Sequence, residues 1–229
     1  MKEFIRYIIN AVFPPLCHEC GSRLLNGERI LCSGCMSALV QTDYIDTEDN
    51  NLVKEYMGLH PIEHALALYY YNAGNTLSRI IKTMKYHHDK ELCQFMGEVM
   101  ASDPRAFHIL KSADALLPVP LTTGREKSRG YNQSTELCRG ICRIVEKDII
   151  TGVLERDVFI DSQTHKSAME RAANIHDAFS LHNPTRLENK HVVIIDDVIT
   201  TTATTRECVY ILRKIPGIKI SVLALARTA

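Results

Sequence analysis

The sequence lacks net charge, long apolar runs and repetition. Its 27 Lys and Arg residues balance 27 Asp and Glu residues, so the formal net charge is +0. That balance argues against a protein whose main task is to grip nucleic acid through its phosphates, although a local basic patch remains compatible with it. No apolar run approaches the length of a membrane span, and we find no internal repeat or low-complexity tract. With 45% hydrophobic residues in 229, the chain can still bury a core as one large domain, or as a medium domain plus a small module.

The N-terminus, MKEFIRYIINAVFPP, places Lys2 and Arg6 ahead of apolar residues, as a secretory signal does. However, no small-residue cleavage site follows. The apolar residues recur at helical spacing, which favours an amphipathic helix that ends at Pro14 and Pro15. We therefore expect a cytoplasmic protein.

Four of the eight cysteines form two CxxC pairs, CHEC and CSGC, separated by eleven residues: Cys17, Cys20, Cys32 and Cys35. Each short pair can bring two thiolates to one ion, and four sulfurs suit tetrahedral Zn²⁺. Gly21 and Gly34 stand where tight turns need a permissive backbone. The alternatives are two disulfides or a redox dithiol, which a cytoplasmic setting disfavours. A site closed by four thiolates has no open position, so we expect it to support folding and not catalysis.

The other cysteines lie within helical patterns and are most simply core residues, although Cys138 and Cys142, one turn apart, could also form a metal or redox pair. Strand-like and helix-like segments alternate along the chain, which predicts an α/β fold with a mostly parallel, doubly wound sheet. We expect an N-terminal helix and zinc module over 1–45, a polar connector over 41–60, and the α/β domain over 60–229. Predicted strands cover 64–71, 148–156, 192–196 and 218–226, and 113–121 is predicted as a strand that runs into a loop. Predicted helices carry the apolar stripes of 77–84, 92–100 and 137–144, and a further helix covers about 203–214. Residues 124–134 are predicted as a loop, and residues 165–179 as a helix or a mobile loop.

The most informative stretch, VVIIDDVITTTATT at 192–205, combines a buried-strand pattern with two acids and a threonine-rich loop. Two carboxylates at the carboxyl end of a parallel strand lie where open α/β sheets bind ligands. The loop offers backbone N–H groups, hydroxyls and a helix N-terminus, which suit a phosphate. Together these features suggest a sugar phosphate. A core strand with an Asx turn and a Thr cap explains less of the pattern, and a receiver-type acceptor site lacks its other parts here.

This stretch resembles the phosphoribosyl-diphosphate (PRPP) motif of type I phosphoribosyltransferases. Further segments resemble the ComF family of competence-associated, phosphoribosyltransferase-like proteins. They are the two CxxC pairs and the FPPLC that leads into them, IIKTMKY at 80–86, DALLPVPL, R-x3-RGYNQS at 125–134, and Gln163, Arg171 and Asn174 before DAF. The resemblance covers nearly the whole chain. It implies a type I phosphoribosyltransferase-like sheet flanked by helices, with a small zinc module at the N-terminus.

The resemblance also implies roles for individual residues. Asp196 and Asp197 would accept hydrogen bonds from the ribose hydroxyls of PRPP, directly or through Mg²⁺-bound water, and are the candidate catalytic pair. Mg²⁺ would be held mainly by diphosphate oxygens, and the 118–121 turn would lie near the diphosphate. The loop that would bind the 5′-phosphate consists of Thr200, Thr201, Thr202, Ala203 and Thr204. The residues that would neutralise the diphosphate are Arg125, Lys127 and Arg129. The reaction would be a glycosyl transfer in which diphosphate leaves ribose C1 through an oxocarbenium-like state, stabilised mostly by electrostatics and positioning.

Thr202 departs from the motif, which has Gly at this place. Glycine allows close approach to a phosphate or a positive φ, and a β-branched residue disfavours both. We therefore predict that Thr202→Gly tightens Mg-PRPP binding, measured by calorimetry, and equal or weaker binding would contradict this.

Several polar residues keep an alternative interpretation. The three cations of 125–129 can also be an ordinary solvated loop, and Tyr131 can stack on a ligand or close the core. Lys82 and Lys85 are predicted on a solvated helix face. Gln163, Arg171 and Asn174 can form a lid or be surface residues, and the histidines at 87, 88 and 165 have no metal-type spacing. The segment around 60–110, where a variable hood would select the acceptor, shows no readable pocket.

Two functions therefore compete. The first is an enzyme of the phosphoribosyltransferase type, or at least a Mg-PRPP binder. The second is a non-catalytic accessory protein in DNA uptake that binds single-stranded DNA or proteins of the competence machinery. A phosphoribosyltransferase-like fold alone does not decide between them.

Overall fold

A parallel five-stranded sheet forms the centre of the molecule. The computed structural model describes residues 13–56, 61–156 and 179–229. The sheet order is β1-β7-β6-β2-β3, and every neighbouring pair is parallel. The strands are β1 (His64–Tyr71), β2 (Ala115–Pro118), β3 (Asp148–Ile149), β6 (His191–Ile199) and β7 (Lys219–Thr228). A separate antiparallel pair consists of β4 (Leu154–Arg156) and β5 (Phe179–Leu181).

The apolar runs of β6 and β7 account for their central position. All four residues of 192–195 are fully buried, as are those of 222–226. Strands that are apolar on both faces need cover on both sides, which is the arrangement of parallel sheets in α/β proteins. The carboxyl ends of β1, β6, β2 and β7 consequently meet at one edge of the sheet.

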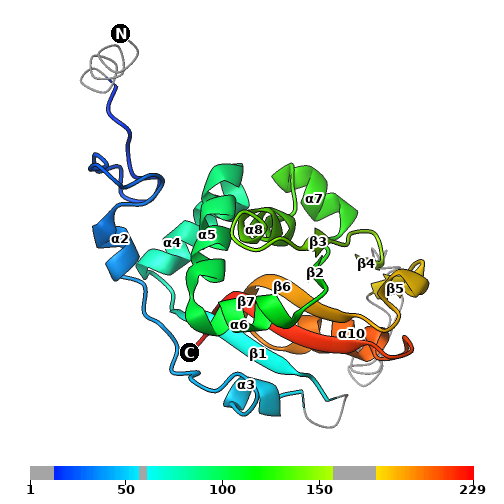
Figure 1. Ribbon diagram of the computed structural model, residues 1–229. Coiled ribbons are helices and arrows are strands. Elements are labelled where there is room, and N and C mark those ends of the chain that lie inside the picture. The colour runs from blue at the N-terminus through cyan, green and yellow to red at the C-terminus, as the bar shows by residue number, and fades with distance from the viewer. Residues whose placement is uncertain (1–12, 57–60, 157–178) are drawn as a thin grey trace, which may run out of the picture.

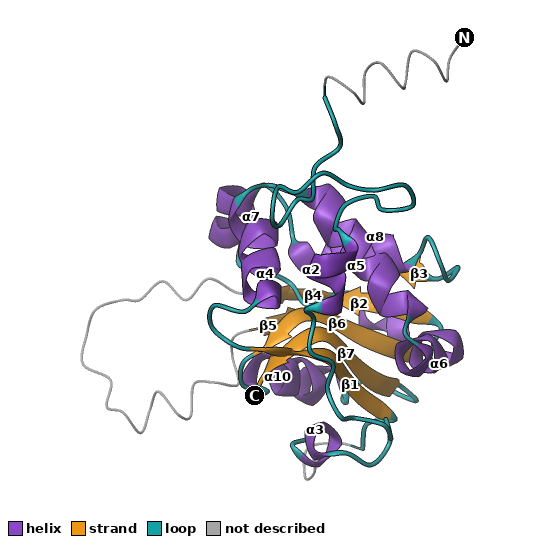
Figure 2. Cartoon of the chain, turned by 90° about the vertical axis from the view of Figure 1, so that its left-hand side faces the viewer, coloured by secondary structure: helices purple, strands orange, loops and turns teal. Residues whose placement is uncertain are grey.

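Helices cover the two faces unequally (Figures 1 and 2). One face carries α4 (Thr76–Tyr86), α5 (Lys90–Ser102) and α8 (Gln133–Ile141), whereas α10 (Ala203–Leu212) lies on the other. The remaining helical elements are α2 (Ser33–Ser37), α3 (Asn51–Lys54), α6 (Pro104–Ser112), α7 (Thr123–Arg129) and the short 3₁₀ turn η2 (Pro184–Leu187). Among the described residues, none of these helices is both long and apolar enough to cross a membrane.

Two glycines let α5 and α8 cross at very short range. A Cβ atom added at Gly140 would lie 1.9 Å from the carbonyl oxygen of Gln94, and one added at Gly97 would lie 2.2 Å from that of Leu137. Only hydrogen fits at these points. The crossing holds α8 close to α5, and Asn132 at the start of α8 donates its side-chain N–H to the carbonyl of Val119 at 2.9 Å.

The expected fold class is confirmed: helices flank a parallel sheet, and four cysteines gather near the N-terminus. The strand predicted at 64–71 has the predicted ends, and those predicted at 192–196 and 218–226 are present with shifted ends. Within 113–121, Ala115–Pro118 form β2 and the chain then leaves the sheet. The helices predicted from the stripes at 77–84, 92–100 and 137–144 and at 203–214 are present with shifted ends. The expected N-terminal helix falls mainly on residues 1–12, and the expected helix or loop at 165–179 falls mainly on 157–178. Both segments lie outside the described residues.

The prediction of a loop over 124–134 is wrong. Thr122 caps α7 by accepting the N–H of Arg125, and Gly130 ends this helix with a φ of +71°. Asn132 then caps α8 through the N–H of Ser134. These two side-chain caps and the left-handed glycine are local signals that divide the segment into two helices.

Two further segments differ from the prediction. Residues 148–156 form β3 and β4 and not one strand, because Gly152 turns the chain with a φ of +72°. Residues 41–56 run along β1, where the N–H of Thr42 donates to the carbonyl of Leu68 at 2.8 Å. They also bury Leu52 and Tyr56, so this part of the predicted connector is packed against the core.

Candidate functional site

Asp196 and Asp197 lie at the carboxyl end of the central strand β6. The backbone N–H of Asp197 donates to Oδ1 of Asp196 at 2.9 Å, which orients the Asp196 carboxylate beside its neighbour. Asp197 is buried and Asp196 is partly buried. The structure therefore places the predicted acidic pair at the edge of the sheet where parallel α/β folds bind ligands.

Lys85 of α4 completes this acidic pair. Its Nζ lies 2.9 Å from Oδ2 of Asp197. The prediction of a solvated face for Lys85 is wrong, because Lys85 follows Leu77 and Ile81 at four-residue spacing and so lies on the apolar stripe that faces the sheet. That spacing is a signal from which its position could have been found.

The surroundings of Asp196 make this carboxyl a much weaker acid than an ordinary aspartate. Burial, followed by the neighbouring Asp197 carboxylate, raises the pKa of Asp196 from 3.8 to about 7. The N–H of Asp197 and the cations Lys85 and Arg156 oppose this shift. A ligand that brings hydroxyl donors or a cation to Asp196 would favour the ionised form.

The threonine loop leads directly into the first turn of α10. Thr200, Thr201 and Ala203 are exposed, Thr204 is partly exposed and Thr202 is buried. Within the described residues Thr202 makes no side-chain cap, which leaves the first N–H groups of α10 available to an anion. The hydroxyl of Thr205 donates to the carbonyl of Thr202 at 3.1 Å and lies 2.6 Å from the hydroxyl of Tyr56, so the base of the loop is held in place.

Thr202 fits its position without backbone strain. Its φ is −73°, in the region that any L-residue adopts. A positive φ is therefore not the reason for which this loop would need glycine. Thr202 therefore differs from a glycine here through the bulk of its side chain, at the place where the backbone would approach a phosphate.

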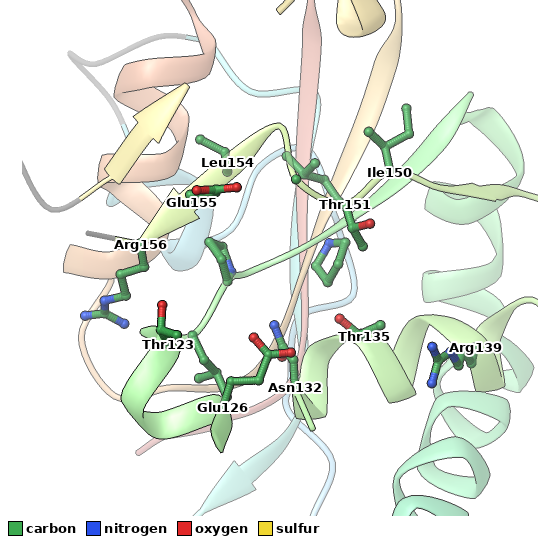
Figure 3. Close-up of a pocket in the computed structure, with 15 residues that line it drawn as sticks. Thr123, Glu126, Asn132, Thr135, Arg139, Ile150, Thr151, Leu154, Glu155 and Arg156 are labelled. Atoms are coloured by element: carbon green, nitrogen blue, oxygen red, sulfur yellow. The ribbon is translucent and has the colours of Figure 1, made fainter. Parts of the chain in front are cut away.

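Two cavities lie near the carboxyl ends of the strands, one beside β2 and one beside β1 and β6. The first, the β2–β4 cavity, has a volume of about 450 Å³ and is lined by residues that include Pro118, Thr123, Glu126, Asn132, Thr151 and Arg156. Figure 3 shows Arg156 and Thr123 at one end of it and Arg139 at the other. The second, the α4 cavity, measures about 580 Å³ and is lined by residues that include Tyr71, Lys82, Lys85, Tyr86, Val198 and Thr200.

The three cations predicted at 125–129 do not join the acidic pair. Arg125 and Lys127 are exposed on α7, and none of the three lines either of these two cavities. Nη1 of Arg129 donates to Oε1 of Gln133 at 2.7 Å, and its guanidinium lies 6.0 Å from the ring of Tyr86. Arg156 is the cation that sequence reasoning missed on this side; it lines the β2–β4 cavity and acts electrostatically on Asp196.

The structure also places Tyr131 and the four cysteines outside the CxxC pairs, for which the sequence allowed more than one interpretation. Tyr131 closes the core, and its hydroxyl donates to the carbonyl of Met84. Cys93, Cys138 and Cys208 are buried, whereas Cys142 is partly exposed and donates to the carbonyl of Lys147 at 3.2 Å. Gln163, Arg171, Asn174 and His165 lie outside the described residues.

The four N-terminal cysteines meet at one point. All are free thiols, and their sulfurs lie within 4.8 Å of one another. The Cys17–Cys35 and Cys20–Cys32 sulfur pairs are each 3.7 Å apart. Sulfurs bonded to one zinc at about 2.3 Å with tetrahedral angles would be separated by about 3.8 Å. The cluster therefore has the donors and the spacing for one metal ion such as Zn²⁺.

Backbone geometry supports the cysteine cluster. The N–H of Cys32 points to the sulfur of Cys17 at 3.3 Å, and the N–H of Cys35 points to that of Cys32 at 3.4 Å. Such bonds orient thiolates around a metal. Gly21 takes a φ of +71° as the tight turn requires, whereas Gly34 needs no positive φ.

The fold and the site together define an α/β protein with a parallel five-stranded sheet, two carboxylates near the carboxyl end of its central strand and an N-terminal four-cysteine module. No family model matches the chain. The predicted resemblance to the ComF family is confirmed by curated relatives. The chain is 28% identical to competence protein F of Haemophilus influenzae over 92% of this chain and 96% of that protein. It is 29% identical to the DNA utilization protein YhgH of Escherichia coli O157:H7 over 66% of this chain and 67% of that one.

Solved structures give weaker similarity. Glutamine PRPP amidotransferase from B. subtilis aligns with a TM-score of 0.40 and 18% identity over 59% of this chain and 26% of that one. Hypoxanthine phosphoribosyltransferase from Trypanosoma cruzi aligns with a TM-score of 0.38 and 13% identity over 60% of this chain and 74% of that one.

Proposed function

We propose that the carboxyl end of β6 binds Mg-PRPP and that the protein is of the phosphoribosyltransferase type. The observation that carries the proposal is the succession of the Asp196–Asp197 pair and the N-terminus of α10, which has no side-chain cap from Thr202. Carboxylates accept hydrogen bonds from ribose hydroxyls, and a helix N-terminus binds a phosphate through its N–H groups.

Each part of PRPP has a matching environment in this proposal. The 5′-phosphate lies against residues 200–204 and the ribose against the acidic pair. The diphosphate lies at the 118–121 turn, beside the polar β2–β4 cavity and Arg156. Mg²⁺ is held mainly by diphosphate oxygens and water, as this ion prefers, and supplies charge neutralisation there. The residues of the chain orient the ribose and stabilise the charge of the departing diphosphate.

Calorimetry with PRPP and Mg²⁺ tests this proposal. Asp196→Asn and Asp197→Asn should each weaken binding about tenfold or more, because each removes a charged hydrogen-bond acceptor. Asp148→Asn is the matched control, since Asp148 is exposed at the opposite end of the sheet. The proposal would be refuted if the wild type did not bind PRPP. It would also be refuted if both site variants bound PRPP as tightly as the wild type.

The biological setting that we propose is DNA uptake in the cytoplasm, supported by the names of the relatives, competence protein F and DNA utilization protein. The same names favour the second candidate function, a non-catalytic accessory protein that binds single-stranded DNA or competence proteins. Diphosphate release from PRPP, assayed with a panel of nitrogen bases, separates the two. Release that Asp197→Asn abolishes supports transfer, whereas single-stranded DNA binding without any release supports the accessory role.

For the four-cysteine cluster we propose structural Zn²⁺ held by Cys17, Cys20, Cys32 and Cys35. The 3.7 Å sulfur pairs support this ion, since they match tetrahedral thiolate coordination. Because four thiolates leave no open position, the ion would stabilise the module without taking part in transfer.

A further inference from the structure

The α4 cavity has a wall chemistry unlike that of the β2–β4 cavity. Aromatic and aliphatic side chains form much of its surface: Tyr71, Ile81, Tyr86 and Val198. Its charged residues are Arg79, Lys82 and Lys85, and no Asp or Glu is among the described residues that line it. It therefore suits a planar molecule that carries a negative charge.

One cation of this cavity is available to a ligand. Arg79 pairs with Glu19 of the cysteine module, and Lys85 pairs with Asp197. Lys82 is exposed and has no ion-pair partner among the described residues. Tyr86, one turn further along α4, exposes 65% of its surface. A cation and a largely exposed aromatic ring at one mouth can bind an anionic group and the ring that bears it, and the Arg129 guanidinium 6.0 Å from the Tyr86 ring adds a second positive charge nearby.

The two cavities lie on opposite sides of β6. In the sheet order β1-β7-β6-β2-β3, the α4 cavity adjoins the end of β1 and the β2–β4 cavity adjoins the ends of β2 and β3. Figure 1 likewise shows α4 and β4 on opposite sides of β6. Lys85 and Thr200 line the α4 cavity, so it opens directly on the Asp197 end of the site.

The geometry of displacement at carbon determines the side from which an acceptor can reach ribose C1. The nucleophile approaches ribose C1 from the side opposite the leaving group, and holding the two in this geometry is a large part of such catalysis. If the diphosphate lies on the β2 side, as in the proposed function, the nucleophile comes from the β1 side. That is the side of the α4 cavity.

We propose that the α4 cavity is the acceptor site and that the acceptor is a planar nitrogen heterocycle bearing a carboxylate or phosphate, bound through Lys82. This rests on the proposed function. The ring nitrogen forms the bond to C1 with its lone pair, the bond between C1 and the diphosphate oxygen breaks, and diphosphate leaves with that electron pair. Any proton on the nitrogen is released to solvent.

Matched probe pairs test the site without turnover. Nicotinate and nicotinamide have the same ring and differ in charge, and adenosine monophosphate and adenosine differ in the phosphate. Binding is measured by NMR titration of the full chain, with and without Mg-PRPP, and read at the ring signals of Tyr71 and Tyr86. We expect at least one charged probe to bind about tenfold more tightly than its neutral partner, as one charge-assisted contact contributes.

Lys82→Met should remove this preference for the charged probe and leave the fold intact, since Lys82 is exposed. Lys219→Met is the control, because Lys219 is an exposed lysine at the opposite end of the sheet. Equal affinity for both members of each pair, or a preference that Lys82→Met leaves unchanged, overturns the proposal. If either of these results is found while the protein still binds Mg-PRPP, the acceptor site is overturned and the proposed function stands. A Lys82-dependent preference without any PRPP binding instead refutes the proposed function and leaves the α4 cavity as an anion site.

Discussion

At the scale of single residues, the site depends on how three charges share one edge of the sheet. Asp196 and Asp197 are adjacent carboxylates with little water around them, and Lys85 contacts only Asp197 directly. Two like charges at this range cannot both be ionised without cost. Burial first, and then the neighbouring Asp197 carboxylate, raise the pKa of Asp196 to about 7.

The Lys85–Asp197 pair should be energetically coupled. Both side chains are largely shielded from water, so removing one partner leaves the other poorly solvated. In a double-mutant cycle of Lys85→Met and Asp197→Asn, we expect a coupling of about 1–2 kcal/mol in the free energy of unfolding. Urea denaturation of the four proteins measures it. A coupling of zero would mean that the pair is only a chance approach.

Asp196 should make stability fall as pH rises. Its pKa is raised on folding from 3.8 to about 7, so the folded state binds the proton more tightly than the unfolded chain. The penalty for ionising it is absent below pH 4, grows between these two values and is complete above the folded pKa. Asp196→Asn lacks this penalty and should exceed the wild type in unfolding free energy by about 1–3 kcal/mol at pH 8. Urea melts from pH 4 to pH 8 measure the difference, and a constant difference would contradict this origin.

Individual residues show what the sequence could predict of the site. The acidic pair and the threonine loop are contiguous, so one motif predicted where they lie. Lys85 and Arg156 are far from that motif in sequence and reach it only through the packing of α4 and the turn at Gly152. The φ of Thr202 depends on how α10 begins. Local patterns carry none of this information.

At the scale of elements, the caps decide where helices begin near the site. Thr122, Gly130 and Asn132 turn a segment with the composition of a loop into α7 and the start of α8. The strands and amphipathic helices were predictable because their apolar periodicity is a local property. The α4 cavity was not, since it forms only where α4 meets the ends of β1 and β6.

The α5–α8 crossing should tolerate no side chain at its glycines. Gly140→Ala places a Cβ against the backbone of Gln94, so we expect a loss of about 2–4 kcal/mol in unfolding free energy from forced overpacking. Gly124→Ala is the matched control: its new Cβ meets nothing within 4 Å on the exposed helix α7, where alanine is the better helix former. Thermal melts of both variants measure the contrast, and equal effects would argue against the close crossing.

At the scale of the whole molecule, the cysteine module is attached to the helices that carry the site. Glu19 pairs with Arg79 of α4, His18 lies 2.6 Å from the Asp89 carboxylate that caps α5, and Arg29 pairs with Glu98 of α5. Surface ion pairs of this kind contribute little when their partners are mobile. They can hold the module only if its own turns are rigid, and four thiolates on one ion would provide that rigidity.

Removal of the metal should therefore release the module while the sheet persists. The parallel sheet has its own buried core, whereas the module around residues 13–37 buries few apolar side chains, among them Leu24, Ile30 and Leu31. After chelation under reducing conditions we expect proteolytic cleavage within 13–40, with the circular dichroism of the sheet and its helices retained. Cobalt substitution should give thiolate charge-transfer absorption that Cys20→Ser and Cys32→Ser weaken, while Cys142→Ser, outside the cluster, leaves it unchanged. A metal-free protein whose module stays folded and resists the protease would show that the four cysteines stabilise it without an ion.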